Sequence, residues 1–394
     1  MDTDGTRDPR GFAFGAVMGM KYVFMAILAG FCLCSIALAQ EYSAISQSTV
    51  IGQNMGYPTG TPRSDLPNNA EGRTDVGNID LVAESVFFGK NLEYGGKIDG
   101  QTFIGFFAPL RLRYRAHEQL TLEAGVVLGH NYGDTNSLDV IKPTVRLAYE
   151  PWRNAYLIAG TIIPTHWIHD ALLDDVQKFR EPAEQGFQFR IDRKHLKSDT
   201  WINWRVREGA FNSEQFEVGV SAQARWRGLH IDLQGINEHT GGQLNSVHNT
   251  LNQTAAYVGG SFGTDGTHWF DNCSWMQSIR FHGGFLVSRN DALMDSHGTG
   301  WELGAYANLR VNEHATLRPF ASYFRGDNFV SPRGDILYSN YKRNPQYGVN
   351  TVFTLPAALC AEIGFAVHPN PNDLNYSFQV NLVWGGSFKL LSLQ

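Results

Sequence analysis

The stretch from Phe216 to Trp226, Phe-Glu-Val-Gly-Val-Ser-Ala-Gln-Ala-Arg-Trp, alternates strictly between two kinds of residue. Alternate residues of a β-strand point to opposite faces, and helical spacing fits this pattern poorly. One face would carry Phe216, Val218, Val220, Ala222, Ala224 and Trp226, and the other Glu217, Gly219, Ser221, Gln223 and Arg225. The stretch therefore predicts a strand with one apolar and one polar face.

The same alternation recurs from about residue 79 to the end of the chain. It is clearest at 301–311 and 374–384, where apolar residues again alternate with polar ones or glycine. Further segments that repeat it lie at 79–88, 103–115, 119–130, 140–150, 155–163, 186–193, 199–207, 229–236, 253–263, 274–288, 314–325, 345–355 and 358–368. These segments predict an all-β chain with about sixteen antiparallel strands.

Strand and loop lengths favour a membrane barrel over a soluble propeller or sandwich. Several predicted strands run for ten residues or more, which matches a tilted strand that crosses a bilayer. Short connections, as at 116–118 and 227–228, alternate with long ones at 164–185, 237–252 and 326–343. We expect a transmembrane β-barrel at 79–394, with short periplasmic turns and longer external loops.

Composition agrees with this expectation and excludes other classes. The chain has 394 residues, of which 43 % are hydrophobic and 12 % aromatic, with 41 glycines and a formal charge of −6. No stretch after the leader is apolar for eighteen residues, so a helical membrane protein is excluded. The sequence has no run of basic residues that would indicate a nucleic acid partner.

The N-terminus predicts export. A short region with Lys21 precedes an apolar run from Tyr22 to Leu38, and Ala37-Leu38-Ala39 has the small-x-small pattern of a cleavage site. We therefore assign 1–39 to a signal peptide, with 1–17 as an upstream start-site extension. The polar segment 40–78 is expected to be a flexible periplasmic lead or a small plug of the lumen.

The polar faces of the predicted strands carry many charged residues. Charge against lipid is costly, by roughly 2–4 kcal/mol for arginine at mid-depth, so these side chains should face the barrel interior. The predicted lumen or selectivity residues are Arg111, Arg113, Arg115, Glu123, Arg146, Arg190, Glu217, Arg225, Asp232, Arg280, Glu302, Arg310 and Glu362. They would select solutes by charge and size, or pair with one another and brace a closed interior. Tryptophans near strand ends, including Trp201, are expected in the aromatic girdles.

Three other kinds of chemistry have weaker signals. His166 and His169, with Asp170 nearby, could share a metal, but the spacing is common and a short amphipathic loop helix around 169–179 is the favoured explanation. His239, with Ser246 in the same predicted external loop, is a candidate base for an enzyme that acts on lipids or envelope polymers. Two Arg-Gly-Asp tripeptides, at 325–327 and 333–335, could serve adhesion, but Gly-Asp is also ordinary turn chemistry.

These features resemble the porin-like outer-membrane proteins of Gram-negative bacteria. Glu184-Gln185-Gly186-Phe187-Gln188-Phe189, followed by Trp201-Ile202-Asn203-Trp204, is also similar to uncharacterised barrels of the Bacteroidota type. The resemblance implies the outer membrane, its lipid, the barrel insertion machinery and homo-oligomers as its setting. We expect a channel or exporter for small polar solutes without catalytic residues, metal or cofactor, with a lipid-directed enzyme and a surface adhesin as alternatives.

Overall fold

The computed structural model describes residues 76–95, 98–133, 140–242, 250–264, 273, 275–291, 296–355, 359–370 and 373–393. All of these belong to one compact unit, 49–394. The predicted signal peptide and nearly all of the predicted lead or plug at 40–78 lie outside the described residues.

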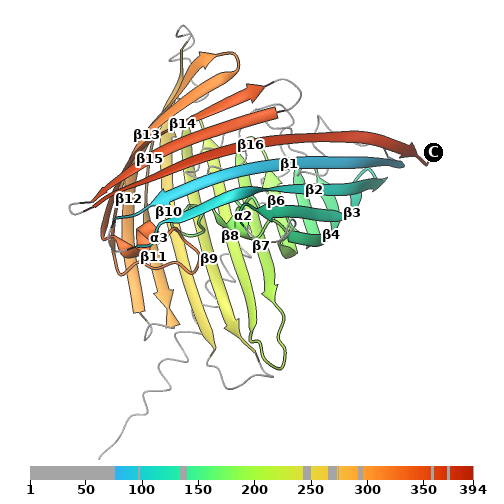
Figure 1. Cartoon of the computed structure of the whole chain (residues 1–394), viewed down its shortest axis with the longest axis horizontal. Coiled ribbons are helices and arrows are strands. Elements are labelled where there is room, and N and C mark those ends of the chain that lie inside the picture. Colours follow the sequence, from blue (N-terminus) through green and yellow to red (C-terminus); the bar gives the residue numbers. More distant parts are fainter. Residues whose placement is uncertain are drawn as a thin grey trace, which may run out of the picture. The chain divides into compact units, whose positions relative to one another are not determined.

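The described residues form a closed antiparallel barrel of sixteen strands, in which each strand pairs with its neighbours in sequence and β1 pairs with β16 (Figure 1). The strands are β1 (Asn78–Glu93), β2 (Gln101–His117), β3 (Leu120–Asn131), β4 (Val140–Trp152), β5 (Ala155–Thr161), β6 (Gln185–Asp192), β7 (Leu196–Val206), β8 (Glu214–Trp226), β9 (Leu229–Gly241), β10 (Leu251–Gly263), β11 (Met276–Asn290), β12 (Ser296–Asn312), β13 (Ala315–Asp327), β14 (Arg343–Leu355), β15 (Leu359–Asn370) and β16 (Asp373–Ser392). Every predicted strand is present, so the predicted fold class and strand number are confirmed.

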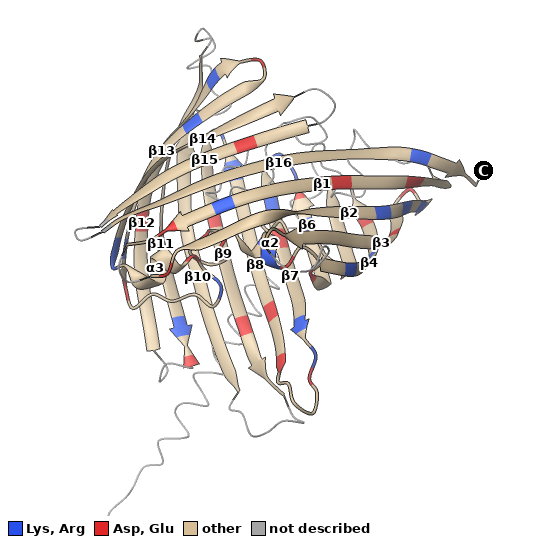
Figure 2. Ribbon diagram, viewed as in Figure 1, with Lys and Arg blue, Asp and Glu red and all other residues tan. Residues whose placement is uncertain are grey.

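The predicted alternation of faces is also confirmed. In β8, Glu217 and Arg225 are buried inside the barrel, whereas Trp226 on the other face is exposed. Most of the outer face of the described strands is apolar, with side chains such as Val145 and Phe285 about two-thirds exposed or more. Figure 2 shows the charged residues spread over many strands rather than gathered on one. An apolar outer wall and a polar inner wall are what a bilayer requires of a barrel.

Loop lengths give the direction of the barrel. One end has connections of two or three residues, such as 118–119, 193–195 and 227–228, although 264–275 is longer. The other end carries 162–184, 207–213, 242–250 and 328–342. By the usual rule for outer-membrane barrels, the first end faces the periplasm and the second faces the cell exterior.

The described residues include two short helices, α2 (Gln177–Arg180) and α3 (Ile336–Asn340), which lie in the connections 162–184 and 328–342. Neither is long and apolar enough to span a membrane. The predicted loop helix around 169–179 is thus reduced to one turn, at α2.

Candidate functional site

The two longest external connections fold into the barrel instead of extending outward, which corrects the expectation of ordinary external loops. We call 162–184 interior loop 1. Its residues Leu172 and Val176 are fully buried. Leu172 belongs to an apolar cluster with Tyr257 of β10, and Val176 to one with Phe88 of β1. Interior loop 1 therefore contacts widely separated parts of the barrel wall and spans the interior.

The connection 328–342, which we call interior loop 2, packs against interior loop 1. The backbone N–H of Asp174 donates to the carbonyl of Arg333 at 2.7 Å, and the N–H of Asp335 donates to the carbonyl of Asp170 at 2.8 Å. Leu173 and Arg333 also form a parallel β-bridge. The two interior loops are thus joined by backbone hydrogen bonds and form one body inside the barrel.

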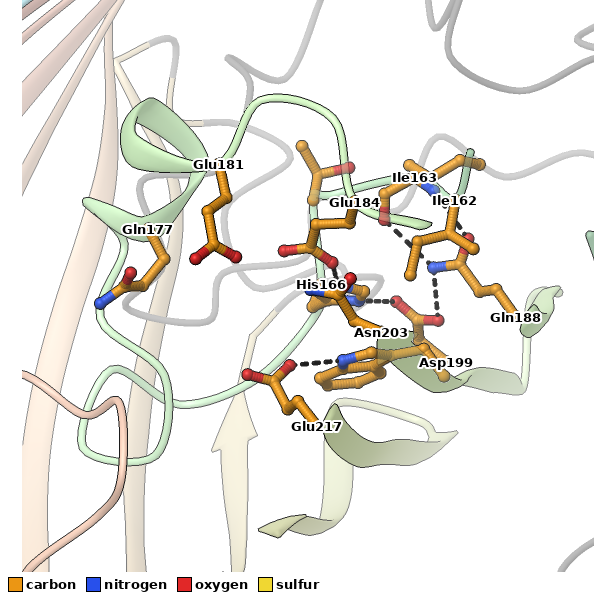
Figure 3. A network of polar contacts seen from close by, with 12 residues as sticks. Ile162, Ile163, His166, Gln177, Glu181, Glu184, Gln188, Asp199, Asn203 and Glu217 are labelled. Atoms are coloured by element: carbon orange, nitrogen blue, oxygen red, sulfur yellow. Dashed lines mark hydrogen bonds and ion pairs between the residues drawn. The ribbon is translucent and has the colours of Figure 1, made fainter. Parts of the chain in front are cut away.

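His166 anchors interior loop 1 to the wall (Figure 3). Its Nδ1 lies 3.0 Å from the Asp199 carboxylate of β7, and its Nε2 lies 2.9 Å from Glu184. Burial opposes the charged form, but the two carboxylates outweigh it and raise the pKa of His166 to about 9. Because both ring nitrogens are engaged, His166 serves as a charged anchor rather than as a free base.

Aromatic rings that lie on glycines of the wall support both histidines of interior loop 1. His166 stacks on Trp201 at 3.7 Å between ring centroids, and a Cβ added at Gly219 would meet the Trp201 ring at 2.0 Å. His169 stacks in the same way on Tyr257, whose ring lies over Gly259 and Gly284. Trp201 is 2 % exposed, so its expected place in the outer girdle is wrong. It shares strand parity with Asp199 and Asn203 and therefore faces inward.

Gly219→Val tests this support. The new side chain would occupy the place of the Trp201 ring and displace it together with His166. We expect the free energy of unfolding to fall by about 1–3 kcal/mol, which is typical of overpacking. Urea unfolding of the refolded barrel would measure the change. Gly89→Val is the matched control, since a Cβ at Gly89 has no neighbour within 4 Å; equal losses in the two variants would contradict the role of the ring.

Arg333 fixes interior loop 2. Its guanidinium contacts Glu217 of β8 at 2.7 Å and Glu181 of interior loop 1 at 3.1 Å. Glu217 also accepts a hydrogen bond from the Trp201 indole at 2.7 Å. Arg333 belongs to the second Arg-Gly-Asp tripeptide, and its side chain is 3 % exposed. Asp335 of the same tripeptide accepts a hydrogen bond from the Leu337 N–H and caps α3. This tripeptide is therefore not available for adhesion.

The predicted lumen residues lie on the inward faces of their strands, and the structure brings several of them together. The Glu123 carboxylate forms ion pairs with Arg113 at 2.6 Å, Arg146 at 3.0 Å and Arg111 at 3.7 Å. Most of the set is buried, namely Arg111, Arg113, Arg115, Glu123, Arg146, Arg190, Glu217, Arg225, Arg280, Glu302 and Glu362. Asp232 is half-buried and Arg310 is exposed. Pairing among these residues, and with the interior loops, accounts for much of the buried charge.

The rest of the set makes smaller contacts. Glu302 lies 2.9 Å from Nε2 of His169, and Arg190 stacks over Trp167 of interior loop 1 at 3.9 Å. Arg225 and Asp232 are linked through Gln223. Arg280 donates to Ser261, and Glu362 accepts from Asn381. Among the described residues, no group of three or more His, Cys, Asp or Glu side chains is arranged to hold a metal ion.

A second cluster lies on the outer face, at the extracellular ends of β8 to β11. His239 was expected in an external loop, but β9 continues to Gly241 and β10 begins at Leu251. Its Nδ1 lies 2.9 Å from Oδ1 of Asn252, and Nδ2 of Asn252 donates to Asp291 at 3.5 Å. Its ring stacks on Phe216 at 4.7 Å. Pairing of His239 with Phe216 places both on the outer face of the wall.

The other nitrogen of His239, Nε2, lies beside Gly241 and Thr250. A Cβ added at Gly241 would lie 3.0 Å from Nε2 of His239 and 3.2 Å from Oγ1 of Thr250. The absence of a side chain at Gly241 thus allows an imidazole nitrogen and a hydroxyl to lie close to its backbone. With Nδ1–H donated to Asn252, Nε2 carries the lone pair, so this nitrogen can accept a proton.

The sequence model of the lipid A 3'-O-deacylase-type family matches residues 72–393. The chain belongs to this family. The match covers the whole barrel, and the expected outer-membrane location is confirmed together with the resemblance to outer-membrane barrels. No curated protein matches the sequence significantly.

The chain is also similar, at low identity, to solved structures of outer-membrane proteins. OmpT of Vibrio cholerae, as its loop L8 deletion mutant, is 10 % identical with a TM-score of 0.48, covering 79 % of this chain and 100 % of that one. The anion-selective porin from Comamonas acidovorans is 10 % identical with a TM-score of 0.46, covering 78 % and 98 %. OprD from Pseudomonas aeruginosa is 14 % identical with a TM-score of 0.45, covering 81 % and 96 %. At these identities no residue role is carried over to this chain.

Proposed function

We propose that this barrel hydrolyses an ester of lipid A in the outer leaflet of the outer membrane. The observation that carries the proposal is the outward-facing row His239–Asn252–Asp291 at the extracellular end of the wall. A polar row on a lipid-facing surface gains nothing from burial, whereas an imidazole with one oriented nitrogen is suited to acid–base catalysis. The description of the family, as lipid A 3'-O-deacylase-type, supports the same reaction.

In the proposed reaction, His239 is the general base. Nε2 takes a proton from water, and the water oxygen forms a bond to the carbonyl carbon of the ester. The acyl C–O bond then breaks, and the leaving alkoxide receives the proton from His239. The products are a free fatty acid and the alcohol of the sugar. Asn252 holds the Nδ1–H tautomer, and Asp291, which is itself held by Arg289 at 3.2 Å, orients the Asn252 amide.

A channel for small polar solutes is the second candidate. The inward row of charged side chains, such as Arg111, Arg113 and Arg115, favours a polar interior. Interior loop 1, however, contacts both β1 and β10, and much of the buried charge is paired. We therefore rank the channel below the hydrolase, and the predicted selectivity residues remain proposals.

The two functions give different results in one experiment. The purified full-length barrel would be inserted into vesicles that contain lipid A and an entrapped polar dye. At pH 6, we expect mass spectrometry to detect free fatty acid and a lipid A that has lost one acyl chain, with the dye retained. Dye loss without any released fatty acid would reject the hydrolase in favour of the channel.

A further inference from the structure

We propose that the two interior loops form a proton-latched plug, which is seated inside the barrel in acid and released from the wall as the pH rises. Its release would open an aqueous path through the barrel. The inference is independent of ester hydrolysis at His239, because the groups involved lie inside the barrel and His239 lies outside it.

The first argument is how the plug is attached. Its polar contacts with the wall include ion pairs between titratable side chains: His166 with Asp199 of β7, His169 with Glu302 of β12, and Asp174 with Lys90 of β1. Hydrogen bonds of neutral groups, such as the one from the His169 N–H to Gln234, accompany them. Arg333 adds the contact with Glu217 of β8. A change in protonation at a few positions can therefore alter the attachment of the whole body.

The second argument is a cluster of carboxylates where the two loops meet. The backbone hydrogen bond between Asp335 and Asp170 holds these residues together, and Asp174 lies 3.8 Å from Nζ of Lys90. Oδ1 of Asp170 is buried and has no hydrogen-bond partner in the described part of the chain. The charged or titratable groups that face this cluster are Lys90, Glu362 and His368 from the wall and Tyr94, Asp175 and Lys178 from the connections. Seating the plug thus crowds several acids around Lys90.

The protonation of these groups acts in one direction. Burial raises the pKa of Asp170 well above its usual value and that of Asp174 to about 6, and Lys90 only partly opposes this. The raised pKa of His166, about 9, comes from its two carboxylate partners. All three groups bind protons more tightly when the plug is seated than when it is released, so raising the pH favours release.

The pH windows follow from the same values. The contribution of Asp174 to the stability of the seated plug is complete below its ordinary pKa of 3.8 and is lost as the pH rises toward 6. The contribution of His166 to the stability of the seated plug is complete below pH 6.5 and is lost as the pH rises toward 9. Arg333 has a raised pKa and stays charged throughout, so it does not reverse the trend. Because Glu184 belongs to interior loop 1 and only Asp199 belongs to the wall, release removes part of this rise, and seating should weaken by at least about tenfold between pH 6 and pH 10 through His166.

Hydrogen exchange on the full-length barrel in lipid vesicles tests the plug directly. We expect protection of 162–184, corrected for the intrinsic pH dependence of amide exchange, to fall by at least about tenfold from pH 6 to pH 10. Protection of the β-strands should remain constant. Protection of 162–184 that is constant or rises over this range would overturn the proposal.

Two variants should shift the behaviour in opposite directions. His166→Gln removes the cation, so the plug should already exchange quickly at pH 6 and lose the dependence above it. Asp170→Asn mimics the protonated acid, so the plug should stay seated to higher pH. Glu313→Gln, at an exposed turn carboxylate, is the control and should behave like the wild type. If both test variants match Glu313→Gln, the proposed groups are not the latch.

Conductance gives an independent readout of release. In planar bilayers, open events of the wild-type barrel should become at least tenfold more frequent between pH 6 and pH 10, in step with the loss of protection. A barrel whose plug loses protection without any rise in conductance would retain the latch but contradict the aqueous path.

Discussion

His239→Ala should lower the rate of fatty acid release from lipid A by about 10²–10⁴-fold, the usual contribution of a general base. The substitution removes Nε2, the atom beside Gly241 and Thr250, while the strand pairing of β9 is unchanged. His239 is only half-buried, on the outer wall, so we expect the variant to fold. The measurement is fatty acid release by mass spectrometry, with the heat-modifiable gel shift as a check of folding.

The variant Asn252→Leu distinguishes a catalytic role of this residue from a role in lipid binding. The leucine keeps the volume but cannot accept the Nδ1–H of His239, so the correct tautomer is no longer held and most of the rate should be lost. Binding of lipid A vesicles should be unchanged. Phe262→Ala, an exposed outer-face residue on the same strand away from the row, is the control and should keep most of the activity. Full activity of His239→Ala would end the proposed role of the row.

Glu123→Leu should cause the largest loss of stability, about 3–5 kcal/mol. The Glu123 carboxylate accepts Arg113 and Arg146 at 2.6 and 3.0 Å, and all three side chains are nearly inaccessible to solvent. Removing the acid leaves buried guanidinium groups without their common partner. Unfolding in urea, followed by the gel shift of the folded barrel, would measure the loss.

Two further variants make this prediction specific. Glu84→Gln neutralises a more exposed acid that pairs with Arg111, and it should cost less. The double variant Glu123→Leu, Arg113→Leu should recover part of the stability, because one of the stranded charges is removed with its partner. A double variant no more stable than Glu123→Leu would show that lost volume, rather than unpaired charge, dominates.

The fold could be predicted from the sequence because the alternation of residues is a local property. Each strand shows its own apolar face, as in Phe216 to Trp226, and antiparallel strands joined by short turns have few alternative arrangements. The inward charges followed from the same parity. Trp201 was misplaced because its proximity to a strand end outweighed its parity with Asp199 and Asn203.

The candidate sites depend on contacts between distant residues, which no local pattern contains. Nothing in the sequence around Arg333 indicates that it reaches Glu217, 116 positions away. The inward course of the interior loops is equally hidden, because a loop that fills a barrel and one that leaves it have similar compositions. His239 was recognised as a candidate base, but its partners Asn252 and Asp291 became apparent only when β9, β10 and β11 were placed side by side.

The span of interior loop 1 has a consequence for how the barrel is assembled. Lys90 and Phe88, which receive one side of the loop, lie on β1, whereas Tyr257 and Glu302 lie on β10 and β12. The barrel closes only when β1 pairs with β16 through backbone hydrogen bonds. The complete binding surface for the loop therefore does not exist while the sheet is still open. We therefore expect the wall to close first and the interior to be filled afterwards, as the final step of biogenesis.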